Sequence, residues 1–285
     1  MGAFSLHVFW LGLWSGFCRV HGKGNALSFY AHVDLDSSKS GKSSARMEMC
    51  MEENGERQVK SRERVRNHGE VFTAEREVKA MCDLVKNETE RIDSRFLEPA
   101  CGDGNFLAEI LRRKLDVCDR RYGNSPRDGE KFSFLAMTSI YGIDILADNV
   151  AACRERLFGI WAARFSNAKN IKSAEDFDLE RVMRFVLEKN ILCGNALSMK
   201  RVDGKGNDLD EPIVFTEWSF VTGDLVKRRE FRFDQLQRRE EDLLFAWAEE
   251  NQAFVPTPIR EWPLADFREL VSCKDAGVRG GRSGK

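Results

Sequence analysis

The sequence predicts an α/β fold, in which an open and mostly parallel sheet carries helices on both of its faces. Short apolar runs of strand length alternate with longer amphipathic stretches of helical spacing. One of these runs leads through a glycine-rich loop directly into a helix, as in ligand-binding α/β folds. A chain of 285 residues also allows one sizeable domain with extensions, stable without disulfides.

Each element is expected from the spacing of its apolar residues. In residues 105–115, for example, Phe106, Ile110 and Leu111 share one helical face. The expected helices cover residues 75–85, 105–115, 148–163, 177–187 and 234–250. The expected strands cover residues 95–99, 139–143, 190–193, 213–215 and 227–233, and residues 116–131 are expected to form a polar loop.

The composition of the chain changes at Met47. Residues 4–18 are apolar like the core of a signal peptide, but no Lys or Arg precedes them, and residues 19–46 are polar and Ser-rich. We therefore expect residues 1–46 to be a disordered or non-native extension, with a targeting segment as the alternative. Residues 47–94 should form a helical segment, residues 95–272 the α/β domain, and the Gly-rich residues 273–285 a disordered tail.

The charge balance and the cysteines narrow the class of protein. Lys plus Arg number 45 and Asp plus Glu 46, so no global charge favours nucleic acid or membrane. The eight cysteines form no Cys-x-x-Cys pair, which is typical of reduced thiols in the cytoplasm. Three of the four histidines lie in the first 32 residues, so we expect no metal site.

Polar and glycine residues follow three of the expected strands. Gly102 and Gly104 come after the first, Asp144 ends the second, and Asn195 follows the third. Because the carboxyl ends of parallel strands share one edge, these residues should lie together and hold a ligand there. A carboxylate at position 144 could accept two hydrogen bonds from a ribose diol.

The loop favours S-adenosylmethionine over NAD as that ligand. The third glycine of the dinucleotide motif is absent, since Leu107 occupies its place. Glu98 and Asp103 bring carboxylates to the loop, where they would repel a pyrophosphate and attract a sulfonium and an ammonium group. An NAD enzyme remains a weaker alternative.

Four segments together resemble the amino-methylating (N6-adenine type) DNA methyltransferases of restriction–modification systems. EPACGDGNF resembles their cofactor motif, and HGEVFTAEREVKAMCDLV resembles the segment that precedes it. YGIDI resembles their ribose-binding acid, and ILCGNAL resembles their adenine-contacting Gly-Asp-Ala. The resemblance covers about residues 66–200 and rests on the order of the four motifs.

The resemblance implies a Rossmann-like class I methyltransferase fold and a set of S-adenosylmethionine contacts. The resemblance implies a methyltransferase-like domain over residues 95–272. The segment 47–94 would complete the cofactor site of this domain. The implied cofactor residues are Phe72 and Thr73 at the methionine end, Glu98, Ala100, Gly102 and Gly104 in the loop, Asp144 at the ribose, and Asn195 at the adenine amino group. Two positions depart from the family pattern: Ala74 replaces a proline and Asn195 replaces an aspartate.

Structural explanations for the same residues stay open. Phe72 could be a core aromatic, and the two glycines could serve only a turn. Asp144 could cap a helix, and Asn195 could belong to a turn beside Gly194.

The catalytic motif of these methyltransferases is missing. It is Asn or Asp followed by Pro-Pro and an aromatic, after the fourth strand, and no Pro-Pro occurs in this chain. By position Glu217 and Phe220 are the candidate catalytic residues, the first as acceptor for the target amino group and the second as stacking ring. The alternative is an ordinary strand end.

The expected function is S-adenosylmethionine-dependent DNA methylation of the adenine-N6 type, by a complete, shortened or subunit enzyme. DNA would be bound with the help of a specificity subunit or another partner, in the cytoplasm and away from membranes. One alternative is an S-adenosylmethionine-binding protein without catalytic activity. Another is a methyltransferase for RNA or protein.

Overall fold

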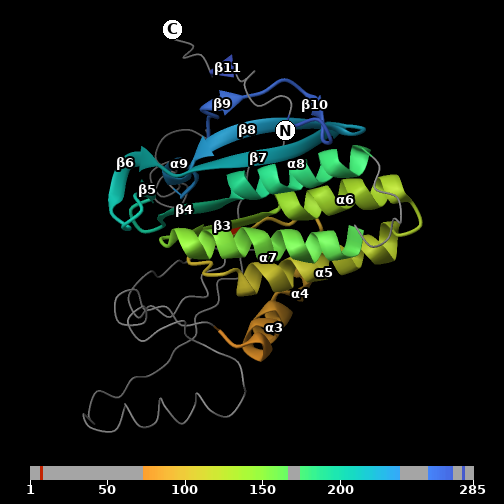
Figure 1. The fold of residues 1–285 in the computed structure, drawn as a ribbon, viewed down its shortest axis with the longest axis horizontal. Helices are drawn as coiled ribbons and strands as arrows, with labels where there is room; N and C mark the ends of the chain where they lie inside the picture. Colours follow the sequence, from red (N-terminus) through yellow and green to blue (C-terminus); the bar gives the residue numbers. More distant parts are fainter. Residues whose placement is uncertain (1–6, 9–72, 166–173, 238–255, 272–277, 280–285) are drawn as a thin grey trace, which may run out of the picture. The chain divides into compact units, whose positions relative to one another are not determined.

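The computed structural model describes residues 7–8, 73–165, 174–237, 256–271 and 278–279. The chain forms two compact units, one of Met1–Trp10 with Glu75–Lys285 and the other of Leu11–Ala74. Only Thr73 and Ala74 of the second unit are described, so every helix and strand below belongs to the first (Figure 1).

The described helices and strands alternate as an α/β pattern requires. The helices are α3 Glu75–Leu84, α4 Lys86–Thr89, α5 Asn105–Tyr122, α6 Pro126–Thr138, α7 Ala147–Phe165, α8 Ala174–Asn190 and α9 Phe233–Gln237. The strands are β1 His7–Val8, β2 Phe96–Glu98, β3 Ile140–Asp144, β4 Ile191–Asn195, β5 Lys200–Val202, β6 Asp208–Pro212, β7 Val214–Thr222, β8 Leu225–Arg232, β9 Arg260–Glu261, β10 Ala265–Asp266 and β11 Val278–Arg279.

The larger sheet is mixed. Its strand order is β1-β2-β3-β4-β5-β6; the pairs from β1 to β4 are parallel, and β5 and β6 continue as an antiparallel hairpin. The α/β class predicted from the sequence is therefore confirmed, with a sheet that is parallel only over its first four strands.

The described long helices gather on one side of this sheet. Residues of α5, α6, α7 and α8 share one apolar core with Ile140 and Ile191 (Figure 1). Strands β2, β3 and β4 follow one another in a single direction, so right-handed crossovers place all their helices on the same face. The opposite face, with Tyr141 and Ile143, packs on Phe215 of β7 and Phe233 of α9. Among the described residues, α9 is the helix on this second face, and most of the helix expected over residues 234–250 lies outside the described residues.

The smaller sheet is built on the β7–β8 hairpin, and β7 runs against the direction of β2–β4. At the start of β7, a Cβ on Gly194 at the end of β4 would lie 2.7 Å from Cδ1 of Ile213. At its end, Phe220 packs edge-on against Phe134 of α6, the helix that precedes β3. Strands β9 and β10 pair with the outer edge of β8, and β11 pairs with β9.

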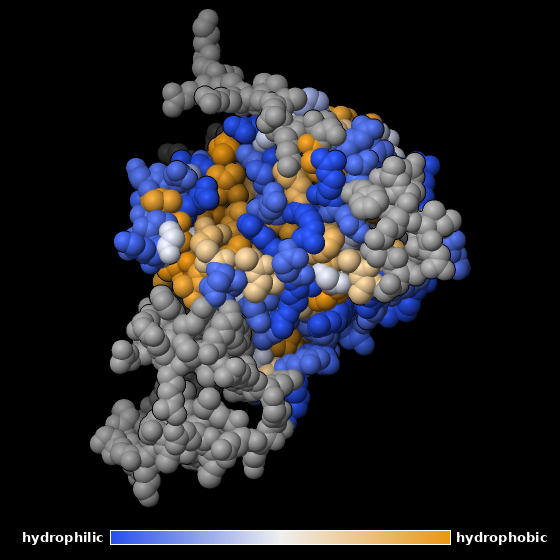
Figure 2. Space-filling view, viewed as in Figure 1, coloured by the Kyte–Doolittle hydropathy of each residue, from blue (hydrophilic) through white to orange (hydrophobic). Residues whose placement is uncertain are grey.

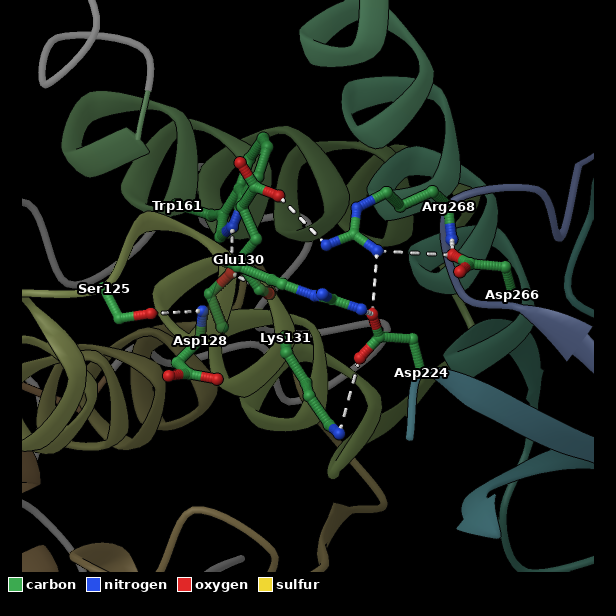
Figure 3. A network of polar contacts seen from close by, with 10 residues as sticks. Ser125, Asp128, Glu130, Lys131, Trp161, Asp224, Asp266 and Arg268 are labelled. Atoms are coloured by element: carbon green, nitrogen blue, oxygen red, sulfur yellow. Dashed lines mark hydrogen bonds and ion pairs between the residues drawn. The ribbon is translucent and has the colours of Figure 1, made fainter. Parts of the chain in front are cut away.

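A network of charged side chains fixes the turn between β7 and β8 to α6. Lys131 donates to the carbonyl of Gly223 and lies 3.5 Å from a carboxylate oxygen of Asp224. Arg268 joins the same Asp224 at 3.3 Å and Glu130 of α6 at 3.4 Å (Figure 3). The end of β7 is therefore anchored beside the amino ends of the parallel strands.

Two expected features differ in the structure. The expected loop 116–131 is wrong, because α5 continues to Tyr122 and α6 begins at Pro126. Ser125 accepts a hydrogen bond from the N–H of Asp128 at 3.3 Å, and proline suits the first helical position. The fourth expected strand, 213–215, extends as β7 to Thr222.

Two short strands fall within segments expected to be disordered. Strand β1 pairs His7 with Phe96 and Val8 with Leu97, and β11 pairs Val278 with Glu261. The rest of residues 1–46 lies outside the described residues, as do residues 47–72. Among the helices that the structure describes, none has the length and apolar character to cross a membrane.

Candidate functional site

Three parallel strands end at one edge of the larger sheet, which we call the carboxyl edge. Strand β2 ends at Glu98, β3 at Asp144 and β4 at Asn195, and Asp144 lies opposite Cys193 in the register. The structure thus brings Glu98, Asp144 and Asn195 to the same edge, as the sequence predicts. The Gly102–Gly104 loop follows β2 there and leads into α5.

The backbone of the loop is held in a fixed turn. Cys101 donates its N–H to the carbonyl of Ile143 at 2.9 Å, and Gly104 donates to the carbonyl of Cys101 at 2.8 Å. Gly102 has φ 54° and Gly104 has φ 91°, which favours glycine at both positions. Gly104 is the N-cap of α5, so the N–H groups of the first helical turn, which have no carbonyl partner within the helix, lie at the carboxyl edge.

Packing against α7 is a second reason for glycine at position 104. A Cβ there would lie 2.7 Å from Sγ of Cys153 and 3.4 Å from its Cβ. We therefore expect a larger residue at position 104 to be excluded whether or not a ligand is bound. Such a residue collides with the protein itself.

Asp144 ties the loop to the end of β3. Its Oδ2 accepts the N–H of Gly102 at 2.9 Å, and its Oδ1 accepts the N–H of Leu146 at 2.8 Å. The side chain of Asn149 also donates to Oδ1, at 3.3 Å. Asp144 is half-buried, and both of its carboxylate oxygens accept hydrogen bonds from the protein, so a ribose would share this carboxylate with Gly102, Leu146 and Asn149.

Glu98 is a buried carboxyl beside the loop. It is 6% exposed, and no described residue forms an ion pair with it. Burial raises the pKa of Glu98 to about 8, although a hydrogen bond from the backbone of Ala100 acts in the opposite direction. A cation placed next to this carboxyl would favour its ionised form.

Asp103 already has a cationic partner. Nη1 of Arg156, from α7, lies 3.2 Å from Oδ1 of Asp103 and 2.5 Å from Oδ1 of Asn105. The positive charge of Arg156 offsets the negative charge that Asp103 brings to the loop. Glu98 is therefore the stronger candidate for contact with a ligand cation.

Asn195 belongs to a turn, which is one of the two roles expected for it. Its Oδ1 accepts the N–H of Leu197 at 3.0 Å and that of Ser198 at 3.4 Å. Its Nδ2 donates to Oδ1 of Asp208 at 3.1 Å. The acceptor proposed for the adenine amino group is thus already used. Ala100, by contrast, is exposed at the loop.

The remaining two cofactor candidates cannot be placed at the carboxyl edge. Phe72 lies outside the described residues, and Thr73 is half-buried in the second compact unit.

The two candidate catalytic residues lie at the opposite edge of the sheet, which corrects their expected place beside the cofactor. Glu217 is 1% exposed; Arg95, directly before β2, lies 3.1 Å from its Oε1, and Arg229 lies 2.5 Å from its Oε2. Phe220 packs on Phe134 and lies 4.8 Å below Nζ of Lys131. Because β7 runs against β2–β4, its end points away from the carboxyl edge. These contacts favour structural roles for both residues.

The β5–β6 hairpin and the contact of Arg156 with the loop were not predicted from the sequence. A Cβ on Gly206, in the hairpin turn, would lie 3.6 Å from Cγ1 of Ile145, so the hairpin borders the carboxyl edge. The signal was the turn-forming run Asp203-Gly204-Lys205-Gly206-Asn207, whose Asp203 accepts two backbone N–H groups at 2.8 and 2.9 Å. No sequence pattern predicts that Arg156 meets Asp103.

The surface near the hairpin mixes acidic and apolar side chains. Figure 2 shows hydrophobic and hydrophilic residues side by side on the face that carries β4–β6 in Figure 1. Leu197 is 67% exposed and Leu209 37% exposed. Among the residues described, no group of His, Cys, Asp or Glu is arranged to hold a metal ion.

The chain was compared with known proteins in three ways. No protein-family model matches it, and neither a curated protein nor a solved structure gives a match.

Proposed function

We propose that the carboxyl edge binds S-adenosylmethionine and that the chain is the cofactor-binding part of a methyltransferase acting on DNA adenine. The fold in this proposal is of the Rossmann-like class I type, and a partner chain supplies recognition of the DNA target. The proposal places the protein in the cytoplasm, where its described cysteines would remain free thiols.

The observation that carries the proposal is the buried carboxyl of Glu98. Taking a carboxylate out of water is costly unless a cation or hydrogen-bond donors compensate. S-adenosylmethionine offers an ammonium and a sulfonium group, whereas NAD would bring a pyrophosphate to the loop beside Glu98. A cationic ligand would compensate the ionised form of this buried carboxyl, and a pyrophosphate would not.

The geometry of the loop supports the nucleoside part of the proposal. Asp144 stands at the end of β3, with Gly102 held against it at 2.9 Å. A ribose placed on this carboxylate would lie beside the amino-terminal turn of α5. The four motif segments that resemble the N6-adenine DNA methyltransferases supply the reaction class.

A second candidate is a protein that binds S-adenosylmethionine and transfers no methyl group. The position of Glu217 and Phe220 favours it, because neither residue lies at the carboxyl edge. In this candidate the bound cofactor stabilises the fold or an assembly.

A calorimetric titration of the full chain with S-adenosylmethionine, with NAD as control, tests the proposal. We expect saturable binding of S-adenosylmethionine alone. Asp144→Ala should weaken it by about 1.5–3 kcal/mol, the value of a hydrogen bond to a charged acceptor. Asp148→Ala is the matched control, since this exposed acid of α7 lies four residues further on. A folded sample that does not bind would overturn the proposal.

Transfer of a labelled methyl group then separates the two candidates. Label in DNA supports the proposed DNA methyltransferase. Label in RNA or protein supports a methyltransferase that acts on that substrate instead of DNA. Binding without label in any of the three supports the second candidate.

A further inference from the structure

The guanidinium group of Arg228, in β8, is buried among aromatic rings. Arg228 is 4% exposed, and its Cζ lies 3.7 Å from the ring centroid of Trp262, directly after β9, and 5.0 Å from that of Phe185 in α8. The backbone N–H of Trp262 donates to the carbonyl of Arg228 at 3.0 Å, so the two residues are neighbours across the β8–β9 pair. Their side chains are stacked on the side of the smaller sheet that faces α8.

This stacked pair contains two buried N–H donors without an acceptor. Among the described residues, no hydrogen bond is found for Nε of Arg228 or for Nε1 of Trp262, although Trp262 is only 2% exposed. Buried donors in native proteins are nearly always satisfied, because an unsatisfied donor has lost its water without replacement. Since the two side chains are in contact, one molecule with several acceptor oxygens can receive both N–H groups.

Positive charge exceeds negative charge around the stacked pair. Glu230 accepts from Nη2 of Arg228 at 3.0 Å and lies 3.8 Å from Nζ of Lys189. Arg260 is opposite Glu230 in the β8–β9 register, and its Cζ lies 5.4 Å from the ring centroid of Trp262. Burial lowers the pKa of both Arg228 and Lys189, and the charge of Arg260 acts in the same direction. Three cations thus surround one carboxylate in this described cluster, which favours an additional anion.

We propose that this cluster binds a phosphate group, held by the N–H groups of Arg228 and Trp262 and by the charges of Lys189 and Arg260. A phosphate supplies both the acceptor oxygens and the negative charge, whereas a water molecule would satisfy the donors and leave the charge uncompensated. The side chain of Lys189 is 38% exposed, so the cluster borders solvent. The inference is independent of the proposed function, because none of these residues belongs to the proposed S-adenosylmethionine site.

Calorimetric titration of the full chain with inorganic phosphate, in a buffer free of phosphate, tests the proposal. The wild type should bind saturably. Trp262→Phe keeps a ring to stack on Arg228 and removes the indole N–H, so it should weaken binding by about tenfold or more, as expected for one hydrogen bond to a charged group. Arg260→Gln should weaken binding through its lost charge. A titration with glycerol 3-phosphate separates two sources: tighter binding indicates an esterified phosphate, and weaker binding a free one.

Trp161→Phe and Arg181→Gln are the matched controls. Trp161 donates its indole N–H to Ser133 at 3.1 Å, and Arg181 is an exposed arginine of α8 that lies 3.5 Å from Asp178. Both variants should bind phosphate like the wild type. A folded wild type without saturable binding, or a folded Trp262→Phe variant with unchanged affinity, would overturn the proposal. If Trp262→Phe does not fold, unchanged affinity in Arg260→Gln overturns it instead.

Discussion

Oδ2 of Asp144 accepts the backbone N–H of Gly102 at 2.9 Å, so the end of β3 and the loop after β2 are held as one unit. The two residues are separated by 42 positions in sequence. The same carboxylate that would bind a ribose therefore also fixes the loop that would surround the cofactor.

Binding of S-adenosylmethionine should depend on pH through Glu98. Its pKa of about 8 leaves the carboxyl largely protonated at pH 7, and a cationic ligand binds the ionised form better. Affinity should rise with pH up to about 8 and then level off. Calorimetry at pH 7 in two buffers of different ionisation enthalpy should show release of a proton on binding.

Glu98→Gln is the control for that prediction. The amide removes the titration of Glu98 while keeping the shape of the side chain, so affinity should become lower and should no longer rise with pH between about 6 and 8. An unchanged pH profile in Glu98→Gln would assign the titration to another group.

Substitution of Gly104 should destabilise the fold through Cys153. Gly104→Ala places a methyl group 2.7 Å from Sγ of Cys153 and forces alanine into φ 91°. We expect a loss of about 2–4 kcal/mol in the free energy of unfolding, from overpacking and backbone strain together. Urea denaturation of the single and double variants measures it, and Cys153→Ala should recover part of the loss. No recovery would show that backbone strain accounts for the whole loss.

Glu217→Gln should lower stability and leave cofactor affinity unchanged. The substitution removes a buried charge that Arg95 and Arg229 share, and leaves both guanidinium groups without it. The expected cost is about 3 kcal/mol, as for breaking a buried ion pair from one side. Chemical denaturation measures the first effect and a titration with S-adenosylmethionine the second. A folded Glu217→Gln variant with lower affinity for S-adenosylmethionine would show that Glu217 contributes to the cofactor site.

Lys114 should make stability rise with pH. Nζ of this fully buried side chain lies 2.5–3.0 Å from the carbonyl oxygens of Arg91, Ile92 and Ser94, and burial lowers its pKa to about 7. Between pH 7 and about 10.5 the unfolded chain holds the proton that the folded chain has lost, so stability increases with pH. Denaturation across this range measures the slope. Lys114→Met should remove it and lower stability by about 1–3 kcal/mol.

The sequence predicts the carboxyl edge well because its signals are local. Strand ends and glycine positions are read from short windows, and Glu98, Asp144 and Asn195 meet because parallel strands end on the same side. The α/β class follows from the same alternation of short apolar runs and amphipathic stretches.

The direction of β7 could not be predicted from local sequence patterns. Alternating apolar residues identify a strand, but whether it joins the sheet in parallel depends on contacts such as Phe220 with Phe134 and Lys131 with Gly223. The catalytic roles expected for Glu217 and Phe220 required a fourth strand parallel to the others. Because β7 runs in the opposite direction, it does not bring these residues to the carboxyl edge. The role of Asn195 likewise depended on Asp208, thirteen residues away across a hairpin that the sequence analysis had not recognised.

The measurement that tests the central claim most directly is a calorimetric titration of three full-length chains with S-adenosylmethionine. The wild type and Glu217→Gln should bind with equal affinity, and Asp144→Ala should bind at least tenfold more weakly, because of the two substituted residues Asp144 alone lies at the carboxyl edge. Equal affinity of the wild type and Asp144→Ala, or no binding by a folded wild type, would contradict a cofactor site at that edge.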